Sequence, residues 1–269
     1  MPDHIVMFSG GAGSWAAAKR VVEDYGPENV KLVFADTMME DEDLYRFLHE
    51  AVENVQAELV YLQEGRDVWQ VFKDKRFIGN TRVDPCSRIL KRELIFSWLE
   101  ETYSDPSDVI IYLGMDWTEG DRFKKAQSYW TPYIVQAPMK EPPYLDKDEV
   151  LEWMKSEGLE PPRLYNMGFP HNNCGGFCIK AGQGHFKLLL EKLPERYAYH
   201  ERKEQEMRDY LGKDVAILRD RRNGQTKPMT LKTFRERVEQ KDSSIDKDEF
   251  GGCGCFTPEE SETVIHLHQ

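Results

Sequence analysis

The residues best suited to chemistry lie near the N-terminus, where the apolar run 5–8 ends in the turn Ser9–Ser14, with the sequence SGGAGS. A helical pattern follows over residues 15–25. Glycines let backbone N–H groups approach an anion closely, and the two serine hydroxyls supply further donors. The N-terminus of a helix adds partial positive charge. The pattern therefore predicts a phosphate-binding turn in a nucleotide-dependent enzyme.

Cysteines are the second source of chemistry, and four of the five form two short, glycine-rich pairs. Thiolates that share a metal centre must come together, and glycine lets the backbone fold tightly around them. Four thiolates suit either zinc or an iron–sulfur cluster. The alternative is that these cysteines are buried and inert, which leaves the glycine flanks unexplained. The predicted metal ligands are Cys174, Cys178, Cys253 and Cys255.

The sequence alone leaves more than one role open for Cys86, for His171 and for a basic run. Cys86 is a further metal ligand, an active-site thiol or a small buried residue. His171 lies three residues before Cys174 and is expected to be an ordinary loop histidine rather than a ligand. Arginines at 219, 221 and 222 form a local basic run with Lys227, which is either solvated or able to receive a phosphate-bearing substrate.

The elements that must position these groups alternate between strand and helix in the first 170 residues. Runs typical of strands cover residues 5–8, 30–35, 59–62 and 109–113, and helical spacing covers residues 44–55, 68–77, 89–103 and 146–158. Alternation of this kind predicts βαβ units and an α/β fold, in which a parallel sheet carries helices on both faces. In such a fold the site lies at the C-terminal ends of the strands.

A second, smaller and mostly helical region is expected from residue 171 to 269, and it contains the cysteine pairs. Helical patterns cover residues 174–192, 195–211 and 231–240, and a hairpin is predicted around the Asn223-Gly224 turn. The polar stretch 241–249 reads as a linker. The first region, residues 1–170, is the predicted nucleotide-binding domain.

Composition excludes several classes of protein. The 48 acidic and 36 basic side chains give a net charge of −12, which disfavours a large nucleic-acid footprint. No apolar run approaches the roughly 20 residues needed to cross a bilayer, and the N-terminus lacks the pattern of a signal peptide. We therefore expect a cytoplasmic protein without membrane contact, whose cysteines are reduced and free for metal or redox chemistry.

The glycine turn has two functional interpretations beside a merely structural one. Gly11, Gly13 and Ala16 fit the G-x-G-x-x-G/A dinucleotide fingerprint, with Asp36 where the ribose-binding acid is expected. The same stretch resembles the SGGxDS turn of the PP-loop ATP pyrophosphatases, although Gly13 stands where many members carry Asp. In that family the turn binds the phosphates of ATP or a related adenosine nucleotide.

Four later segments favour the second interpretation, because they resemble the PAPS reductase-like branch of the PP-loop superfamily in its own order. Phe34–Thr37 with Glu40 resembles F-x-D-T-G-x-E, and Cys86–Lys91 resembles C-[CT]-x-x-x-K. Gly114–Glu119 with Arg122 is similar to G-x-R-x-x-E-S-x-x-R. Leu164–Phe169 with Cys174 is similar to L-Y-x-x-G-[YF]-x-x-x-G-C-x-x-C, and residues 148–153 fit the helix that precedes it.

The resemblance implies roles for matching positions. The nucleotide would be held by Ser9, Gly10, Gly11, Gly13, Ser14 and Asp36. Lys91 and Arg122 would spread phosphate charge, and Glu119 would hold Mg²⁺ or orient a substrate group. Cys86 completes the predicted catalytic set. The bland alternatives are that Lys91 and Arg122 are solvated charges and that Asp36 caps a helix.

The implied activity is that of an ATP- and Mg²⁺-dependent adenylating enzyme, which activates an acceptor for sulfur or nitrogen transfer and releases pyrophosphate. The acceptor is a small molecule or a nucleoside, with nucleic acid less favoured. The first alternative is a PAPS/APS reductase-like sulfonucleotide oxidoreductase. Against it, the chain ends in Ile265–Gln269 without the Glu-Cys-Gly segment of those reductases. The second alternative is a nucleotide- or metal-binding module without catalysis, which Gly13 supports.

Overall fold

A five-stranded parallel sheet is the centre of this computed structural model, which describes residues 2–80, 83–252 and 255–258. The strand order is β3-β2-β1-β4-β5, and every neighbouring pair is parallel. The strands are β1 Asp3–Met7, β2 Val30–Asp36, β3 Glu58–Gln63, β4 Val109–Tyr112 and β5 Ile134–Gln136. The predicted α/β fold with a parallel sheet is therefore confirmed, and β5 is the strand that the sequence patterns missed.

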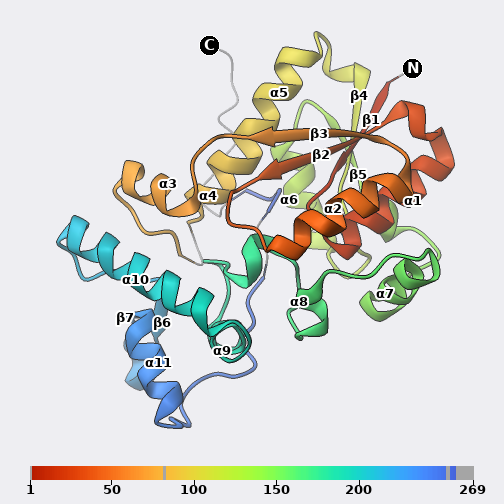
Figure 1. Cartoon of the computed structure of the whole chain (residues 1–269). Helices are drawn as coiled ribbons and strands as arrows, with labels where there is room; N and C mark the ends of the chain where they lie inside the picture. Colours follow the sequence, from red (N-terminus) through yellow and green to blue (C-terminus); the bar gives the residue numbers. More distant parts are fainter. Residues whose placement is uncertain (1, 81–82, 253–254, 259–269) are drawn as a thin grey trace.

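Alternate residues of the central strands face opposite sides of the sheet, and both sides are covered by helices (Figure 1). Val6, Leu32 and Phe34 pack on one side with α1 Ala12–Tyr25 and α2 Glu42–Val55, and α7 Lys147–Ser156 joins the same core. Ile5 and Val33 pack on the other side, together with α5 Leu94–Thr102 and α6 Gly120–Tyr129. Burial on both faces explains why these strands read as continuous apolar runs.

A third core belongs to a mostly helical region beside the sheet (Figure 1). Phe72 and Leu90, which precede residue 170, share it with Phe186, Tyr197 and Phe234, which follow it. Its elements are α3 Val68–Lys75, α4 Pro85–Ser87, the π-helix Arg88–Glu93, α8 Arg163–Asn166, α9 Gln183–Lys192, α10 Pro194–Leu211, α11 Leu231–Glu239 and the hairpin of β6 Leu218–Asp220 with β7 Lys227–Met229. The predicted hairpin is confirmed.

Two helical predictions need correction. The helix expected over residues 174–192 begins only at Gln183, because Cys174, Gly175 and Gly176 have φ angles of 51°, 58° and 80° and turn the backbone into the left-handed region. The helix expected over 89–103 begins as a π-helix before α5. Short 3₁₀ helices cover Pro27–Asn29, Pro106–Asp108, Pro138–Lys140, Asn173–Gly176 and Arg222–Gly224.

The strand order reverses at β1, which has β2 on one side and β4 on the other. At such a switch point the connections leave the sheet in opposite directions and open a crevice beyond the strand ends. The connection from β1 to α1 and the connection from β4 to α6 both start there. Among the described residues, no helix combines the length and apolar character that a membrane span requires.

Candidate nucleotide pocket and thiol cavity

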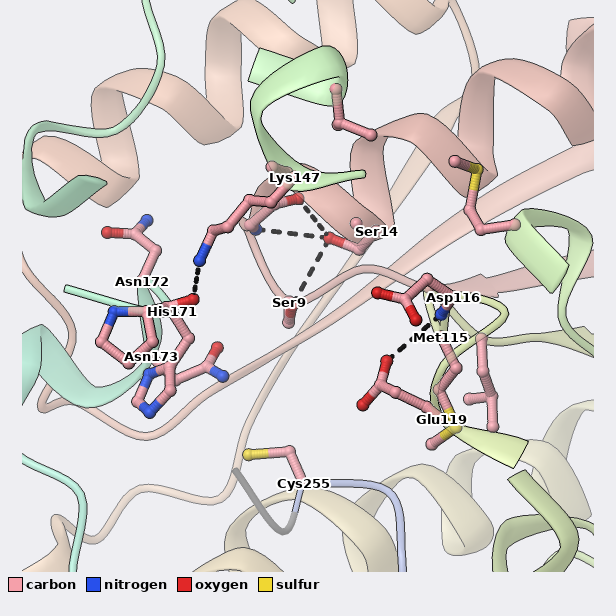
Figure 2. A pocket seen from close by; sticks show the side chains of 18 of the residues that line it. Ser9, Ser14, Met115, Asp116, Glu119, Lys147, His171, Asn172, Asn173 and Cys255 are labelled. Atoms are coloured by element: carbon pink, nitrogen blue, oxygen red, sulfur yellow. Dashed lines mark hydrogen bonds between the residues drawn. The ribbon is translucent and has the colours of Figure 1, made fainter. Parts of the chain in front are cut away.

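A pocket of about 350 Å³ lies at this switch point (Figure 2). Its walls come from the β1–α1 turn, the β4–α6 connection, the start of α7, residues 170–173, and residues 251–252 and 255–256. Its polar and glycine lining includes Ser9, Gly11, Gly13, Ser14, Gly114, Asp116, Glu119, Arg122, Lys147, Tyr165, His171, Asn172, Asn173 and Cys255. The topology and the predicted phosphate turn thus lead to the same place.

The turn is organised around Ser14, in the first turn of α1. Its hydroxyl donates to the carbonyl of Gly11 at 2.8 Å and accepts from the Gly11 N–H at 3.3 Å. The Ser9 hydroxyl oxygen lies 3.4 Å from the Ser14 hydroxyl oxygen. The first N–H groups of a helix have no intrahelical acceptor, so this end of the 14-residue α1 suits an anion.

Close backbone contact explains two of the glycines. A Cβ on Gly13 would lie 2.7 Å from the Gly114 carbonyl oxygen, and a Cβ on Gly114 would lie 2.5 Å from the Gly13 carbonyl carbon. The β1–α1 turn and the β4–α6 connection therefore touch through bare backbone. Gly13, the departure from the family turn, is the residue that this contact requires.

One wall of the pocket carries paired charges. The Arg122 guanidinium binds the Glu119 carboxylate, and its other nitrogen donates to the Cys255 carbonyl at 3.1 Å. The second Glu119 oxygen accepts from the Asp116 N–H at 3.2 Å. Asp116 and Glu119 lie together on this side of the pocket (Figure 2). Two carboxylates beside a phosphate-binding turn are what Mg²⁺ uses in nucleotide sites.

The opposite wall holds Lys147, His171 and Asn172 (Figure 2). Burial lowers the pKa of the Lys147 amine, which donates to the Pro170 carbonyl and lies 4.7 Å from the centre of the Tyr165 ring. Burial, and then the nearby His185 and Lys147, lower the pKa of His171 to about 3, so its imidazole is neutral. This wall therefore supplies one cation and one neutral imidazole.

Asn172 connects that wall to the turn. Its side chain is 1% exposed, and its Nδ2 donates to the Gly10 carbonyl at 2.9 Å. Its Oδ1, like Nδ1 of His171, is buried with no hydrogen-bond partner among the described residues. Because a buried polar atom without a partner is costly, these two atoms are suited to a bound group.

A second, smaller cavity of about 30 Å³ lies beside the pocket and is lined by four cysteines. They come from three segments of the chain: Cys86 from α4, Cys174 and Cys178 from the segment before α9, and Cys255 from the C-terminal segment. We call this the thiol cavity. Burial and then the neighbouring Cys255 raise the pKa of the Cys178 thiol to about 12. Burial, Asp84 and the other thiols raise the pKa of Cys86 well above its usual value.

Charged groups surround the thiol cavity. Lys91 is 2% exposed and lies 3.4 Å from the Glu40 carboxylate, whose other oxygen accepts from the Cys174 N–H at 2.5 Å. Lys180 lies 3.5 Å from the buried Asp84. Lys91 and Lys180 both line the cavity. Each lysine is thus balanced by a buried carboxylate at the edge of the cavity.

The predicted site residues thus divide between the two cavities. Ser9, Gly11, Gly13, Ser14, Glu119 and Arg122 line the pocket, whereas Lys91, Cys86, Cys174 and Cys178 line the thiol cavity. Cys255 lines both. Cys253 lies outside the described residues, and in the described part of the chain Cys86 is the fourth thiol of the cavity.

Two predicted nucleotide-binding residues do not line the pocket. Gly10 has a φ of 70° and packs against Leu44. Asp36 is 3% exposed at the end of β2, where its carboxylate accepts from the hydroxyls of Tyr45 and Tyr61. The structure therefore gives Asp36 a role in holding the end of the strand.

The basic run near the hairpin is paired in the structure. Arg221 lies 2.6 Å from the carboxylate of Glu249, and Arg222 lies 2.6 Å from that of Asp220. Arg221 and Arg222 are thus paired with carboxylates, and a phosphate-receiving patch in this run stays a prediction.

Sequence patterns missed the wall formed by Lys147 and Asn172. The capping box of α7, with Asp146 and Glu149, marks a helix start in the sequence, and Lys147 is the first residue of that helix. Nothing local shows that this helix end faces a turn more than 130 residues earlier. Lone asparagines in a loop carry no pattern of their own.

Comparisons with known proteins show distant likeness. No family model matches the sequence, and a search of curated proteins gives no match. Among solved structures, the chain is similar to the phosphate complex of phosphoadenylyl-sulfate (PAPS) reductase from Candida auris, with a TM-score of 0.45, 15% identity, and coverage of 63% of this chain and 79% of that chain. It is also similar to the NH3-dependent NAD synthetase from Campylobacter jejuni in complex with nitrate, with a TM-score of 0.40, 14% identity, and coverage of 78% and 83%.

Both likenesses have TM-scores below 0.5 and sequence identities of 15% or less. Values this low describe a similar arrangement of elements and carry nothing about residues or substrates. The fold of the chain is given by its own strand order: a doubly wound, Rossmann-like α/β sheet with a smaller helical region.

Proposed function

We propose that this protein is an ATP-dependent adenylating enzyme of the PP-loop type. The observation that supports it best is the pocket at the switch point, which joins the serine–glycine turn to a wall of carboxylates and an arginine. The motif resemblance over residues 5–178 supports the same conclusion. Residues 1–170 would form the nucleotide-binding unit, and residues 171–269 would complete its site.

In this proposal the start of α1 and the hydroxyls of Ser9 and Ser14 bind phosphate oxygens. Arg122 and Lys147 spread the charge that develops during transfer, which is how proteins mainly accelerate such reactions. Asp116 and Glu119 would hold Mg²⁺, which would bridge phosphate oxygens and neutralise their charge. Lys91, predicted for phosphate, is assigned instead to the thiol cavity.

The chemistry then has two steps. An acceptor oxygen attacks the α-phosphorus of ATP, the bond from that phosphorus to the bridging oxygen breaks, and pyrophosphate leaves with the electron pair. A sulfur or nitrogen nucleophile next attacks the activated carbon of the acceptor and displaces AMP. The proton released by the nucleophile passes to solvent or to a nearby base.

Incubation with Mg²⁺ and ATP labelled in the α-phosphate tests this proposal, with candidate acceptors added singly. Acceptor-dependent formation of pyrophosphate and a labelled adenylylated acceptor is expected, and labelled AMP should follow when sulfide or ammonia is added as the nucleophile. Formation of ADP and phosphate would contradict it, because the bond cleaved would then be the wrong one. Nucleotide binding without turnover over the whole set would favour the alternative of a non-catalytic module.

We also propose that the thiol cavity binds a metal centre through Cys86, Cys174, Cys178 and Cys255. The residues fit, since four thiols and two lysines line one cavity. Thiolates bound to one zinc ion lie about 3.8 Å from one another, given Zn–S distances of about 2.3 Å. Among the described residues, no group of three metal-binding side chains is placed to hold a metal ion. Four thiolates suit either zinc or an iron–sulfur cluster, and we propose the cluster. Such a cluster would supply electron-transfer or sulfur-binding chemistry.

Metal analysis with visible spectra of anaerobically purified protein tests the ligand set. Iron with sulfide and absorbance near ~400 nm is expected for the wild type, and its loss is expected in Cys86→Ser. Cys253→Ser is the matched variant. Loss of metal in Cys253→Ser but not in Cys86→Ser would restore the ligand set predicted from sequence, and stoichiometric zinc would exclude the cluster.

One observation favours a second function, sulfonucleotide reduction. Cys255 lines the thiol cavity and the nucleotide pocket at once, so a thiol is available to a nucleotide bound there. Release of sulfite and an adenosine nucleotide from APS or PAPS, with a dithiol as reductant, would establish this activity. Under the adenylating function no sulfite is expected from either compound.

A further inference from the structure

Two strongly exposed aromatic side chains, Trp117 and Tyr144, stand at the rim of the nucleotide pocket. Their rings are 51% and 57% exposed, and the ring centroids lie 6.0 Å apart at an interplanar angle of 58°. Trp117 lies between the pocket-lining residues Asp116 and Glu119, and Tyr144 directly precedes Leu145, which also lines the pocket. The rings themselves lie outside the pocket lining and form a pair at its edge.

Both rings are carried by segments that are held in place. On the Trp117 side, the Asp116 carboxylate accepts from the Thr118 N–H at 2.8 Å and from its hydroxyl at 2.5 Å. On the Tyr144 side, the Arg20 guanidinium donates to the carbonyls of Pro138 and Glu141, both at 2.8 Å, and to a third at Pro143. These bonds hold the chain next to each ring.

The chemistry of the pair restricts what it can bind. Exposed aromatic faces gain most from a flat partner that covers them and keeps polar edges in water. Nucleobases have this form, and base–aromatic stacking tolerates any base because each has a π face. The pocket, at about 350 Å³, is within the range of complete small-ligand sites. Neither ring belongs to the pocket lining, so a nucleotide held by that lining would leave both rings open to a second substrate.

We propose that Trp117 and Tyr144 bind the nucleobase of the acceptor, so that the acceptor is a base-containing compound. This inference rests on the proposed function, because it takes the pocket as the ATP site. The base is part of either a free nucleotide or a single strand. The net charge of −12 offers little attraction to a long nucleic acid, so a free nucleotide is the favoured source.

Titration calorimetry tests this on full-length protein saturated with Mg²⁺ and a non-hydrolysable ATP analogue. The probes are CMP, UMP and GMP, and ten-nucleotide single strands of RNA and DNA. At least one probe is expected to bind. Trp117→Ala and Tyr144→Ala should each weaken it at least fivefold, Trp117→Phe should stay within about threefold, and the affinity for the ATP analogue should stay unchanged. Tyr210→Ala is the matched control, since Tyr210 is 44% exposed on α10.

The outcomes separate this inference from the function on which it rests. Binding of a mononucleotide identifies a free acceptor, and binding of strands alone identifies a base within nucleic acid; both support the proposal. An ATP analogue that binds without any probe would overturn it and leave the proposed function intact. Weaker binding of the analogue to Trp117→Ala would assign the pair to adenine and also overturn it. A protein that binds neither analogue nor probe would refute both proposals.

Discussion

The nucleotide pocket and the thiol cavity lie side by side but are built in different ways. The core of the pocket is one contiguous turn, Ser9–Ser14, placed by β1 and α1. The thiol cavity takes its four cysteines from three segments that are far apart in the chain. The turn is formed by neighbouring residues at the end of one strand. The thiol cavity forms only when the helical region packs beside the sheet. A continuous motif therefore predicts its own geometry, and a dispersed one does not.

The largest effect should come from Gly13→Asp, which restores the residue that many PP-loop turns carry. The new Cβ would lie 2.7 Å from the Gly114 carbonyl oxygen, and such overpacking costs about 1–3 kcal/mol. We expect a loss of more than a hundredfold in ATP affinity with the metal content retained, measured by calorimetry and metal analysis.

Gly120→Ala is the matched control for that variant, because Gly120 starts α6 and the nearest atom to an added Cβ is 3.9 Å away. It should bind ATP as the wild type does. If Gly13→Asp instead bound ATP normally, the backbone contact between the two connections would not shape the site.

A smaller effect is expected from Arg122→Gln. This change removes the partner of Glu119 and the donor to the Cys255 carbonyl, and it removes a cation from the wall. Loss of one charge-stabilising donor costs roughly a hundredfold in turnover. The rate of AMP formation is the measurement. Unchanged turnover would mean that Arg122 only supports the structure, and a loss of metal would show that the two cavities depend on each other.

Asn172→Ala should have a moderate effect on the pocket alone. The variant removes the 2.9 Å hydrogen bond to the Gly10 carbonyl inside the protein. A buried acceptor left without its donor costs about 1 kcal/mol or somewhat more, so ATP affinity should fall roughly fivefold to tenfold. Asn29→Ala, whose exposed amide binds the Tyr25 carbonyl, should leave affinity unchanged. An equal loss in both variants would point to a general effect on α1.

The smallest effect concerns pH and the helical region. His200 accepts from the Trp69 indole at 3.1 Å and stacks on Phe177, and burial holds its pKa well below the usual value. The unfolded chain binds this proton below a pH of about 6.5 while the folded chain does not, so stability is constant above that pH and falls as the pH drops. Between pH 7 and pH 5 we expect about 2 kcal/mol from this residue at most.

Chemical unfolding at the two pH values measures that loss, and His200→Phe should reduce the pH dependence while lowering stability at pH 7. A pH dependence identical in the variant would assign the effect to His171 and His185, whose pKa values are also lowered by burial.

Much of the sheet could be predicted from sequence because strands buried on both faces are long apolar runs. The apolar run Val30–Asp36 is easily recognised as a buried strand. Strand β5 has only three residues, two of them exposed, so its sequence shows no strand pattern. The helix start at Gln183 was misplaced because left-handed φ angles at Cys174 and its two following glycines are a tertiary feature. The glycines that follow Cys174 indicate a tight turn of the backbone, but they do not show which way the chain turns.

The candidate site was predictable where chemistry and spacing coincide in a short stretch. The turn residues and the pair Glu119 and Arg122 belong to such stretches, and the structure brings them into one pocket. The family motif implies that Lys91 binds phosphate. In the structure, however, Lys91 lines the thiol cavity. Which cavity a side chain enters depends on packing between distant elements, which one sequence does not reveal.

The C-terminal segment completes the walls of both cavities. Gly182 and Gly184 donate to the carbonyls of Phe250 and Glu249, Trp130 donates to that of Phe256, and Arg122 donates to that of Cys255. Both cavities take part of their wall from this late segment. During synthesis, the sheet and its glycine turn therefore emerge long before either site is enclosed. A chain cut before residue 255 would lack part of the wall of both cavities, so the sheet and its turn could form without either site being enclosed.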